Sequence, residues 1–184
     1  MLSYVFWHWP RAGVAASEYE ARQRAFHAAL QAAPSEGFAR SITHGVAGAS
    51  WANGGAAAYE DWYILRDSAA LDPLNAAAVS ASRQVPHDAA AAAAAGGIAG
   101  LYSLQLGAMP PAPTHAAWFA KPDGVRYPDF FARLEPSVTR GDAGLWMRHM
   151  TLGPAREFCL MSRAPVTLPS ELSAVHLALR PVWG

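Results

Sequence analysis

The strongest constraint in this chain is an internal repeat. Three segments of the first half recur in the same order in the second half, and the first pair aligns without a gap. The matched pairs are Trp7–Val14 with Trp118–Val125, Ala39–Gly45 with Met147–Gly153, and Asp61–Leu65 with Glu157–Met161. A repeat of this size indicates two copies of one supersecondary unit, which bury their apolar faces against each other.

Each copy is predicted to alternate strands with helical segments. The aromatic run Ser3–Trp9 is typical of a strand, and Pro10 ends it. The other elements expected in the first copy are helices at 17–33 and 69–82 and strands at 38–44, 59–66 and 100–106. In the second copy we expect strands at 115–120, 144–151, 156–162 and 174–180, a helix at 127–134 and a helical turn near 169–173.

A proline-rich segment separates the two copies. The prolines of Met109–Pro113 remove backbone donors, so this segment can continue neither a strand nor a helix. We therefore expect a first repeat at 1–108, a linker at 109–114 and a second repeat at 115–184. The first repeat carries insertions at about 46–58 and 83–97. Such insertions are either lids and pocket walls or neutral surface loops, and the sequence leaves both open.

The predicted element order defines a fold class. Strand–helix–strand–strand–helix–strand is the ferredoxin-like order, in which helices cover one face of the sheet. The other face needs a cover, and the sheet of the second copy is available. We therefore predict an α+β fold in which two fused ferredoxin-like βαββαβ repeats pack sheet-to-sheet as a pseudo-dimeric α/β barrel. In element order and internal repeat, the chain resembles the dimeric α/β-barrel superfamily.

That resemblance implies several functions and does not choose among them. Members of the superfamily include small monooxygenases, haem-handling enzymes, lactone isomerases and ligand-sensing modules. The chain matches none of their catalytic motifs residue by residue. The fold alone therefore leaves the reaction undetermined.

Composition excludes several classes of partner. The chain has 14 basic and 14 acidic residues among 184, so it lacks the positive charge expected for binding nucleic acid or an anionic membrane. A single cysteine, Cys159, excludes an internal disulfide and a thiolate zinc cluster. The N-terminus has no signal-peptide pattern, and no apolar run approaches the ~20 residues of a membrane span. We expect a cytoplasmic protein.

Strand alternation predicts which side chains share a face. On the third strand of the first repeat, we expect the apolar Trp62 and Ile64 to face the helices. Asp61 and Tyr63 would then face the space between the two sheets, together with Glu157 of the second repeat. On the second strands, the polar Ser41, Thr43 and His149 are expected to point into the same space.

These expected positions define a candidate small-molecule site. We predict Asp61, Tyr63 and His8 as catalytic candidates, because a buried carboxylate and an imidazole suit acid–base chemistry near neutral pH. Candidate ligand-binding residues are Ser41, Thr43, His44, Trp51, His149 and Glu157. The alternatives also stay open: structural histidines, an ion pair or a surface carboxylate, and a packing tryptophan. The histidine spacing matches no metal-binding motif, so we predict no metal site.

Two functions remain open from the sequence. One is an enzyme that acts on a small, largely apolar molecule between the sheets by cofactor-independent oxidation or isomerisation, as the resemblance implies. The other is a non-catalytic ligand-binding or sensing protein, or a haem-binding member of the superfamily. Whether the chain is an enzyme and which cofactor it uses stay undetermined. We expect a monomer or a homodimer with a small-molecule ligand.

Overall fold

The computed structural model describes all residues from 1 to 184 as one nine-stranded antiparallel sheet with four α-helices. The strands are β1 (Leu2–Pro10), β2 (Phe38–Val46), β3 (Ala58–Leu65), β4 (Ala94–Gly107), β5 (His115–Phe119), β6 (Gly144–Arg148), β7 (Phe158–Ser162), β8 (Val175–Ala178) and β9 (Arg180–Trp183). The helices are α1 (Ala16–Ala32), α2 (Leu71–Ala78), α3 (Gln84–Ala93) and α4 (Tyr127–Arg140). We call residues 1–108 the first unit and residues 115–184 the second unit.

The two units have the same strand order. The sheet runs β8-β5-β7-β6-β4-β1-β3-β2-β9, so the first unit contributes β4-β1-β3-β2 and the second contributes β8-β5-β7-β6. This is the order of the ferredoxin-like unit, and the predicted α+β fold is confirmed. The second helix of the second unit is only a 3-10 turn, Ser170–Leu172.

Pairing between the units nearly closes the sheet into a barrel. β4 pairs with β6 where the two units meet. At the opposite end, only Leu179 separates β8 from β9; β8 pairs with β5 and β9 pairs with β2. The C-terminal segment therefore bridges the two edges of the sheet, which leaves few unpaired backbone groups.

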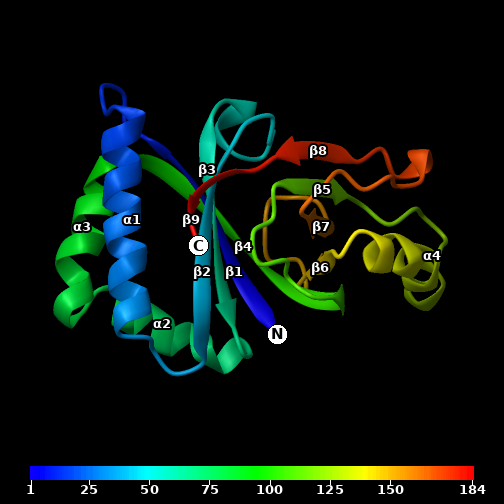
Figure 1. The fold of residues 1–184 in the computed structure, drawn as a ribbon, viewed down its shortest axis with the longest axis horizontal. Helices are drawn as coiled ribbons and strands as arrows, with labels where there is room; N and C mark the ends of the chain where they lie inside the picture. Colours follow the sequence, from blue (N-terminus) through cyan, green and yellow to red (C-terminus); the bar gives the residue numbers. More distant parts are fainter.

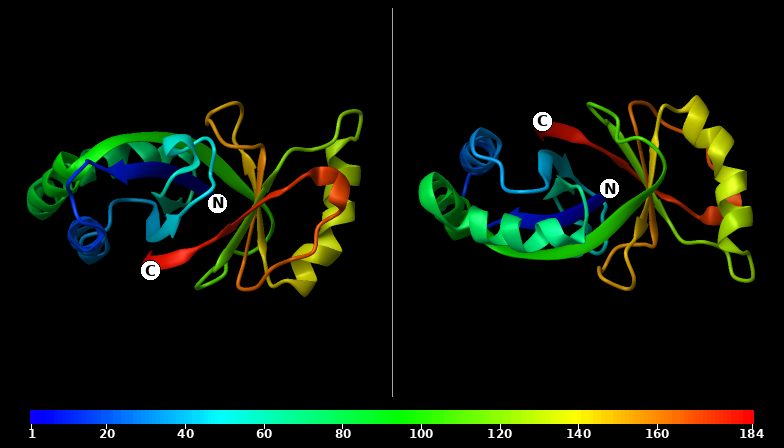
Figure 2. Two further views of the ribbon diagram at one scale, coloured as in Figure 1. Left: turned by 90° about the horizontal axis from the view of Figure 1, so that it is seen from above. Right: turned by 90° about the horizontal axis from the view of Figure 1, so that it is seen from below.

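The helices lie on two outer sides of the molecule, with the strands between them. α1, α2 and α3 cover the first unit, and α4 covers the second (Figure 1). Seen from above and below, each helical layer lies outside its own strands, and the strands of the two units face each other (Figure 2). Each half of the sheet therefore has an outer face toward its helices and an inner face toward the other unit.

Tryptophan side chains fill the space between the units. Trp7, Trp62, Trp118 and Trp146 are fully buried and belong to one apolar cluster with Tyr102, Cys159 and Met161. The hairpin insertion at 46–58 adds Ala49 and Ala52 to this cluster, with Trp51 packed against it. The inner faces therefore form the largest core of the protein, and buried side chains occupy the space where the ligand site was expected.

One carboxylate is buried within this aromatic core. Glu60 is fully buried, and each of its oxygens accepts an indole N–H at 2.6 Å, one from Trp7 and one from Trp62. Burial raises the pKa of Glu60 to about 7 against the opposing effect of these hydrogen bonds. Glu60 therefore titrates near neutral pH inside the barrel.

The predicted face assignment is wrong for the first unit. Trp62 and Ile64 point into the barrel, whereas Tyr63 and Leu65 belong to the core beneath the helices. Asp61 contacts His27 of α1, so it also lies on the helix side. In the second unit, Cys159 and Met161 point inward and Phe158 and Leu160 point outward, as expected.

Register explains the error. Trp7 lies opposite Glu60, and Trp118 lies opposite Cys159. The structure therefore makes Glu60 equivalent to Cys159, whereas the repeat alignment matched Tyr63 with Cys159. The two matches differ by an odd number of residues, and in a strand an odd shift moves every side chain to the other face.

Two element boundaries also differ from expectation. α4 continues through Pro136 to Arg140, although we expected it to end near Leu134. β4 begins at Ala94, so Gly96 and Gly97 lie within a strand. A β-carbon at Gly97 would lie 2.3 Å from the Phe6 ring, so this strand approaches β1 closely only because the residue is glycine.

Candidate functional site

A cavity of about 610 Å³ lies between the first-unit strands and helices α1–α3. β1 and β3 supply one wall through alternate side chains, and the helices supply the other. Its lining is mostly apolar: Tyr4, Phe6, His8, Tyr19, Gln23, Phe26, Leu30, Asp61, Tyr63, Leu71, Asp72, Leu74, Asn75, Ala78, His87, Ala90, Ala91, Ala94, Ala95, Gly96 and Gly97. The candidate site is therefore on the helix side of the first unit, whereas we expected it between the sheets.

Small residues leave this space open. The insertion at 83–97 forms α3 and the start of β4, and its contribution to the lining is mostly alanine and glycine. The exposed lining residues are Asp72, Asn75, Ala91, Ala95 and Gly97, so the mouth lies beside α2, α3 and the start of β4. The insertion is therefore a wall of the cavity, and the hairpin insertion at 46–58 is not.

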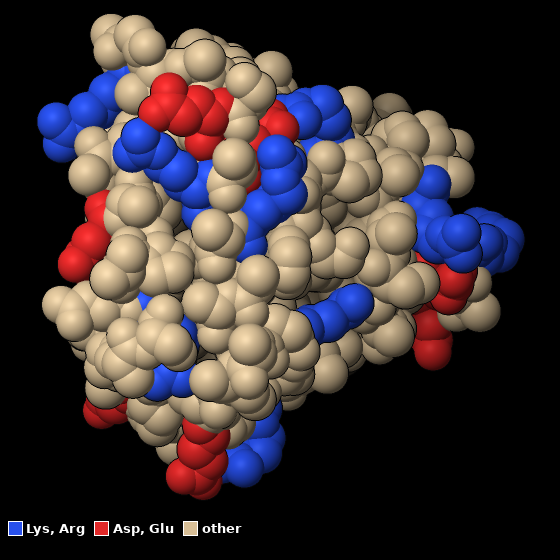
Figure 3. All heavy atoms as spheres, turned by 60° about the vertical axis from the view of Figure 1, so that its left-hand side comes forward, with Lys and Arg blue, Asp and Glu red and all other residues tan.

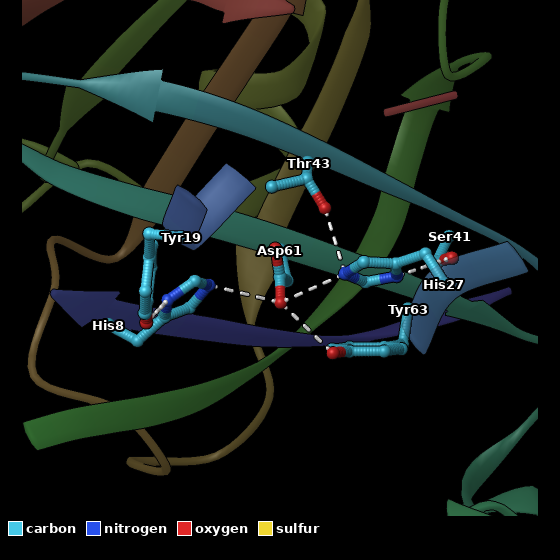
Figure 4. Close-up of polar contacts among 7 residues, drawn as sticks. All are labelled: His8, Tyr19, His27, Ser41, Thr43, Asp61 and Tyr63. Atoms are coloured by element: carbon cyan, nitrogen blue, oxygen red, sulfur yellow. Dashed lines mark hydrogen bonds and ion pairs between the residues drawn. The ribbon is translucent and has the colours of Figure 1, made fainter. Parts of the chain in front are cut away.

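Asp61 is the centre of the polar end of the cavity (Figure 4). Its Oδ2 accepts a hydrogen bond from the Tyr63 hydroxyl at 3.0 Å. The Nε2 atoms of His8 and His27 each lie 3.2 Å from the same oxygen. His8 Nε2 is close enough to Asp61 for an ion pair but is not aligned for a hydrogen bond. The other carboxylate oxygen, Asp61 Oδ1, is buried without a hydrogen-bond partner. The carboxylate therefore holds three side chains from β1, α1 and β3.

Each imidazole is held by a hydroxyl at its other nitrogen. His8 Nδ1 lies 2.6 Å from the Tyr19 hydroxyl, and His27 Nδ1 lies 2.8 Å from the Ser41 hydroxyl. Thr43 Oγ1 lies 2.9 Å from His27 Nε2. With Nε2 directed at a carboxylate, this network assigns the Nε2–H tautomer to both rings, with the hydroxyls donating to Nδ1.

Burial and charge set the ionisation of the polar end. Burial alone would raise the pKa of Asp61, but the adjacent His8 and His27 outweigh it and hold that pKa well below its usual range. Burial and the Asp61 charge raise the pKa of Tyr63 well above its usual range, and they also raise the pKa of Tyr19. At neutral pH the site therefore contains one carboxylate and two neutral phenols.

The arrangement does not fit a metal ion or haem. His8 and His27 lie on opposite sides of the Asp61 carboxylate in Figure 4, and no group of three or more His, Cys, Asp or Glu side chains could hold a metal ion. The Tyr19 hydroxyl lies 2.6 Å from His8 Nδ1 and the Asp61 carboxylate lies 3.2 Å from His8 Nε2, so haem iron could reach neither nitrogen without displacing one of these side chains. The lining contains no Lys or Arg to pair with haem propionates and contains two carboxylates, Asp61 and Asp72.

The structure brings the three predicted catalytic candidates together. His8, Asp61 and Tyr63 all line the cavity and contact one another through Asp61. Ser41 and Thr43 lie on the same side of the sheet, behind the cavity, where they contact His27.

The other predicted binding residues lie elsewhere. His44 is buried on the inner face of β2, and burial lowers its pKa to about 4. Trp51 packs against Trp7 and Trp118 at centroid distances of 6.2 and 5.2 Å. In the second unit, the Glu157 carboxylate accepts a hydrogen bond from Tyr127 at 2.6 Å, and His149 is in the turn after β6. None of these four lines the cavity.

Sequence reasoning missed Tyr19 and His27. Both are on α1 and fully buried, and helix periodicity places Tyr19 on a predicted apolar side without indicating a polar role. A usable signal was present in the repeat. If the gapless alignment of Trp7 with Trp118 is extended into the helix, Tyr19 aligns with Phe130 and His27 aligns with Val138. The first unit is therefore polar at two positions where the second unit is apolar.

Charges on the helix side are mixed. Figure 3 shows Lys and Arg interspersed with Asp and Glu, with no broad area of one sign on this face. The pairs include Arg180 with Glu20 and Arg22 with Glu18. None of the helices is both long and apolar enough to cross a bilayer.

Solved structures share this fold at low sequence identity. A protein from Lactobacillus acidophilus NCFM, provisionally named a monooxygenase, matches with a TM-score of 0.52 and 12% identity over 98% of this chain and 94% of that chain. A protein provisionally named a chlorite dismutase matches with a TM-score of 0.52 and 10% identity over the same shares. No family model matches the chain, and no curated protein matches it in sequence. The chain thus has the predicted dimeric α/β-barrel fold, and identity this low carries no further conclusion.

Proposed function

We propose that the first unit is an enzyme that removes a proton from a small, largely apolar molecule bound in its cavity. The observation that supports this most strongly is the buried chain Tyr19–His8–Asp61 at the end of an apolar, open cavity. An apolar cavity with a few converging polar groups is the usual form of a small-molecule site. An imidazole backed by a buried carboxylate is suited to accept a proton.

The contacts suggest a path for that proton. The substrate hydroxyl proton moves to the Tyr19 oxygen while the Tyr19 proton moves to His8 Nδ1. The negative charge of Asp61 stabilises the imidazolium that forms. The electron pair of the broken O–H bond stays on the substrate as an oxyanion. Because burial keeps Tyr19 protonated at rest, Tyr19 serves as a relay rather than a standing base.

Substrate deprotonation is a first step shared by cofactor-independent oxidation and isomerisation. Oxidation needs dioxygen as the electron acceptor, and isomerisation needs only return of the proton to another atom. Naphthohydroquinone tests the oxidative version, because it is flat and apolar and carries two hydroxyl donors. One molecule and one dioxygen give one naphthoquinone and one hydrogen peroxide, so atoms and electrons balance.

The test is dioxygen consumption above the spontaneous rate. We expect the wild-type protein to accelerate the reaction, and His8→Gln and Tyr19→Phe to reduce kcat/KM by about 100-fold. Ala91→Trp, which places an indole at the cavity mouth, should raise KM sharply. Glu157→Gln is the matched control, because that carboxylate is in the second unit and outside the cavity. Equal rates for wild type and His8→Gln would exclude the proposed role of His8.

A non-catalytic binding protein is the alternative, and the same experiment separates it. Saturable binding of naphthohydroquinone that Ala91→Trp weakens, with no acceleration of dioxygen consumption, would support a binding role. The cytoplasmic location and the choice between monomer and homodimer remain predictions from the sequence.

A further inference from the structure

The hydrogen-bonding groups at the buried end of the cavity are mostly acceptors. The Tyr19 hydroxyl is committed to His8 and the Tyr63 hydroxyl to Asp61, so each phenolic oxygen has lone pairs left and no free proton. Asp61 Oδ1 is buried without any partner. Among the other lining side chains, Tyr4 carries a hydroxyl and Gln23 an amide, and Asn75 and His87 are exposed or partly exposed beside the mouth.

The charge of the lining is unfavourable for anions. None of the 21 lining residues is Lys or Arg, and two, Asp61 and Asp72, are acidic. The neighbouring histidines keep Asp61 ionised. An anionic ligand would lose its hydration without gaining a cationic partner, and burial of an unpaired charge is strongly unfavourable.

The floor of the cavity is aromatic. Tyr4, Phe6 and His8 are alternate residues of β1 that face the helices. Tyr4 and Phe6 stack at a centroid distance of 6.4 Å, and Phe6 and His8 stack at 5.2 Å. This row of rings offers a flat aromatic ligand an extended apolar contact surface.

We propose that this cavity selects flat aromatic molecules that carry a hydrogen-bond donor and no negative charge, such as phenols and arylmethylammonium ions. The donor would contact the Tyr19 and Tyr63 oxygens or the unpartnered Asp61 oxygen. This inference specifies which ligands the cavity binds, so it rests on the part of the proposed function that makes this cavity the binding site. It does not require turnover.

Four naphthalene compounds of similar size test this selection. They are β-naphthol, β-naphthylmethylammonium, the donor-free methyl β-naphthyl ether and the anion β-naphthoate. Dissociation constants would be measured by calorimetry on the full-length protein at neutral pH. We expect the two donors to bind at least about tenfold more tightly than the ether. We expect β-naphthoate to bind about 100-fold more weakly than β-naphthol.

Variants connect the selection to named groups. Asp61→Asn should raise the affinity for β-naphthoate relative to β-naphthol by about tenfold, because the negative charge is lost. If Asp61→Asn does not fold, Tyr63→Phe provides the second test, since loss of this oxygen should reduce the preference for β-naphthol over the ether. Glu157→Gln should leave all four affinities unchanged.

Two results would overturn the proposal in distinguishable ways. Binding of β-naphthoate or the ether as tightly as β-naphthol, weakened by Ala91→Trp, would keep the cavity as a binding site and remove the donor selection. No binding of any of the four would remove both the site and the selection. Selective binding without oxidation of naphthohydroquinone would keep the selection and remove the proposed reaction.

Discussion

The two units share one strand order but differ beneath their helices. The first unit has a cavity and a buried polar network on that side, whereas the second has a solid apolar core. Strand register gives the equivalent positions. Asp61 lies opposite Phe6 in the first unit, and Leu160 lies opposite Ala117 in the second. The central carboxylate of one unit is therefore a leucine in the other.

The same replacement extends to four further members of the network. Thr43 lies opposite Asp61, and Leu145 lies opposite Leu160. His8 and Phe119 follow the equivalent residues Trp7 and Trp118. Counted from the first residue of α1 and of α4, Tyr19 corresponds to Phe130 and His27 to Val138. Five linked polar residues in the first unit thus correspond to five buried apolar residues of one cluster: Phe119, Phe130, Val138, Leu145 and Leu160.

This comparison separates what the fold requires from what function requires. The second unit shows that the fold is satisfied by apolar residues at all five positions. Replacing a buried ion pair with well-packed apolar residues of similar volume is often neutral or stabilising, so stability does not require the polar network. The network occurs in the first unit alone and lies beside the cavity of about 610 Å³, which supports a functional role for that side.

The largest effect is expected from opening the solid side of the molecule. Phe130 is 1% exposed and packs against Phe158 at a centroid distance of 5.2 Å. Phe130→Ala should reduce the free energy of unfolding by about 4 kcal/mol. Phe26→Ala in the first unit should cost less than half as much, because the Phe26 ring already borders the cavity. Equal losses in chemical denaturation would contradict this contrast between the units.

The second effect compares the two carboxylates that the repeat alignment had matched. Asp61→Asn should reduce the free energy of unfolding by about 2 kcal/mol, because three side chains lose a buried charged partner. Glu157→Gln should change it by less than about 1 kcal/mol, since its partner Tyr127 is exposed. Urea denaturation at neutral pH measures both changes. Comparable losses of stability would contradict the prediction that Asp61 stabilises the fold more than Glu157 does.

The third effect is a pH dependence that comes from Glu60. Its pKa is raised by burial from 4.5 to about 7, so the folded protein keeps a proton that the unfolded chain releases. This stabilising effect is complete below about pH 4.5 and is lost as the pH rises through about 7. His44, whose pKa is lowered to about 4, acts in the opposite direction and partly masks the trend in the wild type.

A variant isolates the contribution of Glu60. Relative to wild type, Glu60→Gln should gain up to about 1.4 kcal/mol of stability per pH unit between about pH 4.5 and 7. Denaturation of both proteins across this window gives the difference, from which the His44 contribution cancels. A constant difference across the window would show that Glu60 does not titrate there.

The last prediction concerns Cys159, the second-unit residue equivalent to Glu60, and the expected result is that its thiol does not react in the native protein. Cys159 is fully buried, and burial raises the pKa of its thiol well above the usual range. A thiol reagent should therefore label the unfolded chain and leave the native protein unlabelled, because the thiolate is the reactive form. Rapid labelling under native conditions would show that the barrel interior opens readily.

Much of the fold follows from local patterns along the chain. The aromatic run that forms β1, the proline-rich linker and the repeated order of elements were enough for the ferredoxin-like units and their sheet-to-sheet packing. His8, Asp61 and Tyr63 were also identified as a group, because polar side chains on aromatic and β-branched strands are conspicuous. Tyr19 and His27 were not, since a helix pattern indicates which side is buried and says nothing of partners across the core.

What the sequence determined by itself was therefore the order of elements and the set of polar residues in the first three strands. Tertiary structure alone decided which face of the sheet those residues occupy, and so placed the candidate site beneath α1 rather than in the barrel interior. The physical reason is the two-residue period of a strand. The choice between faces depends on register with neighbouring strands, and those long-range pairings leave no mark in the sequence of a single strand.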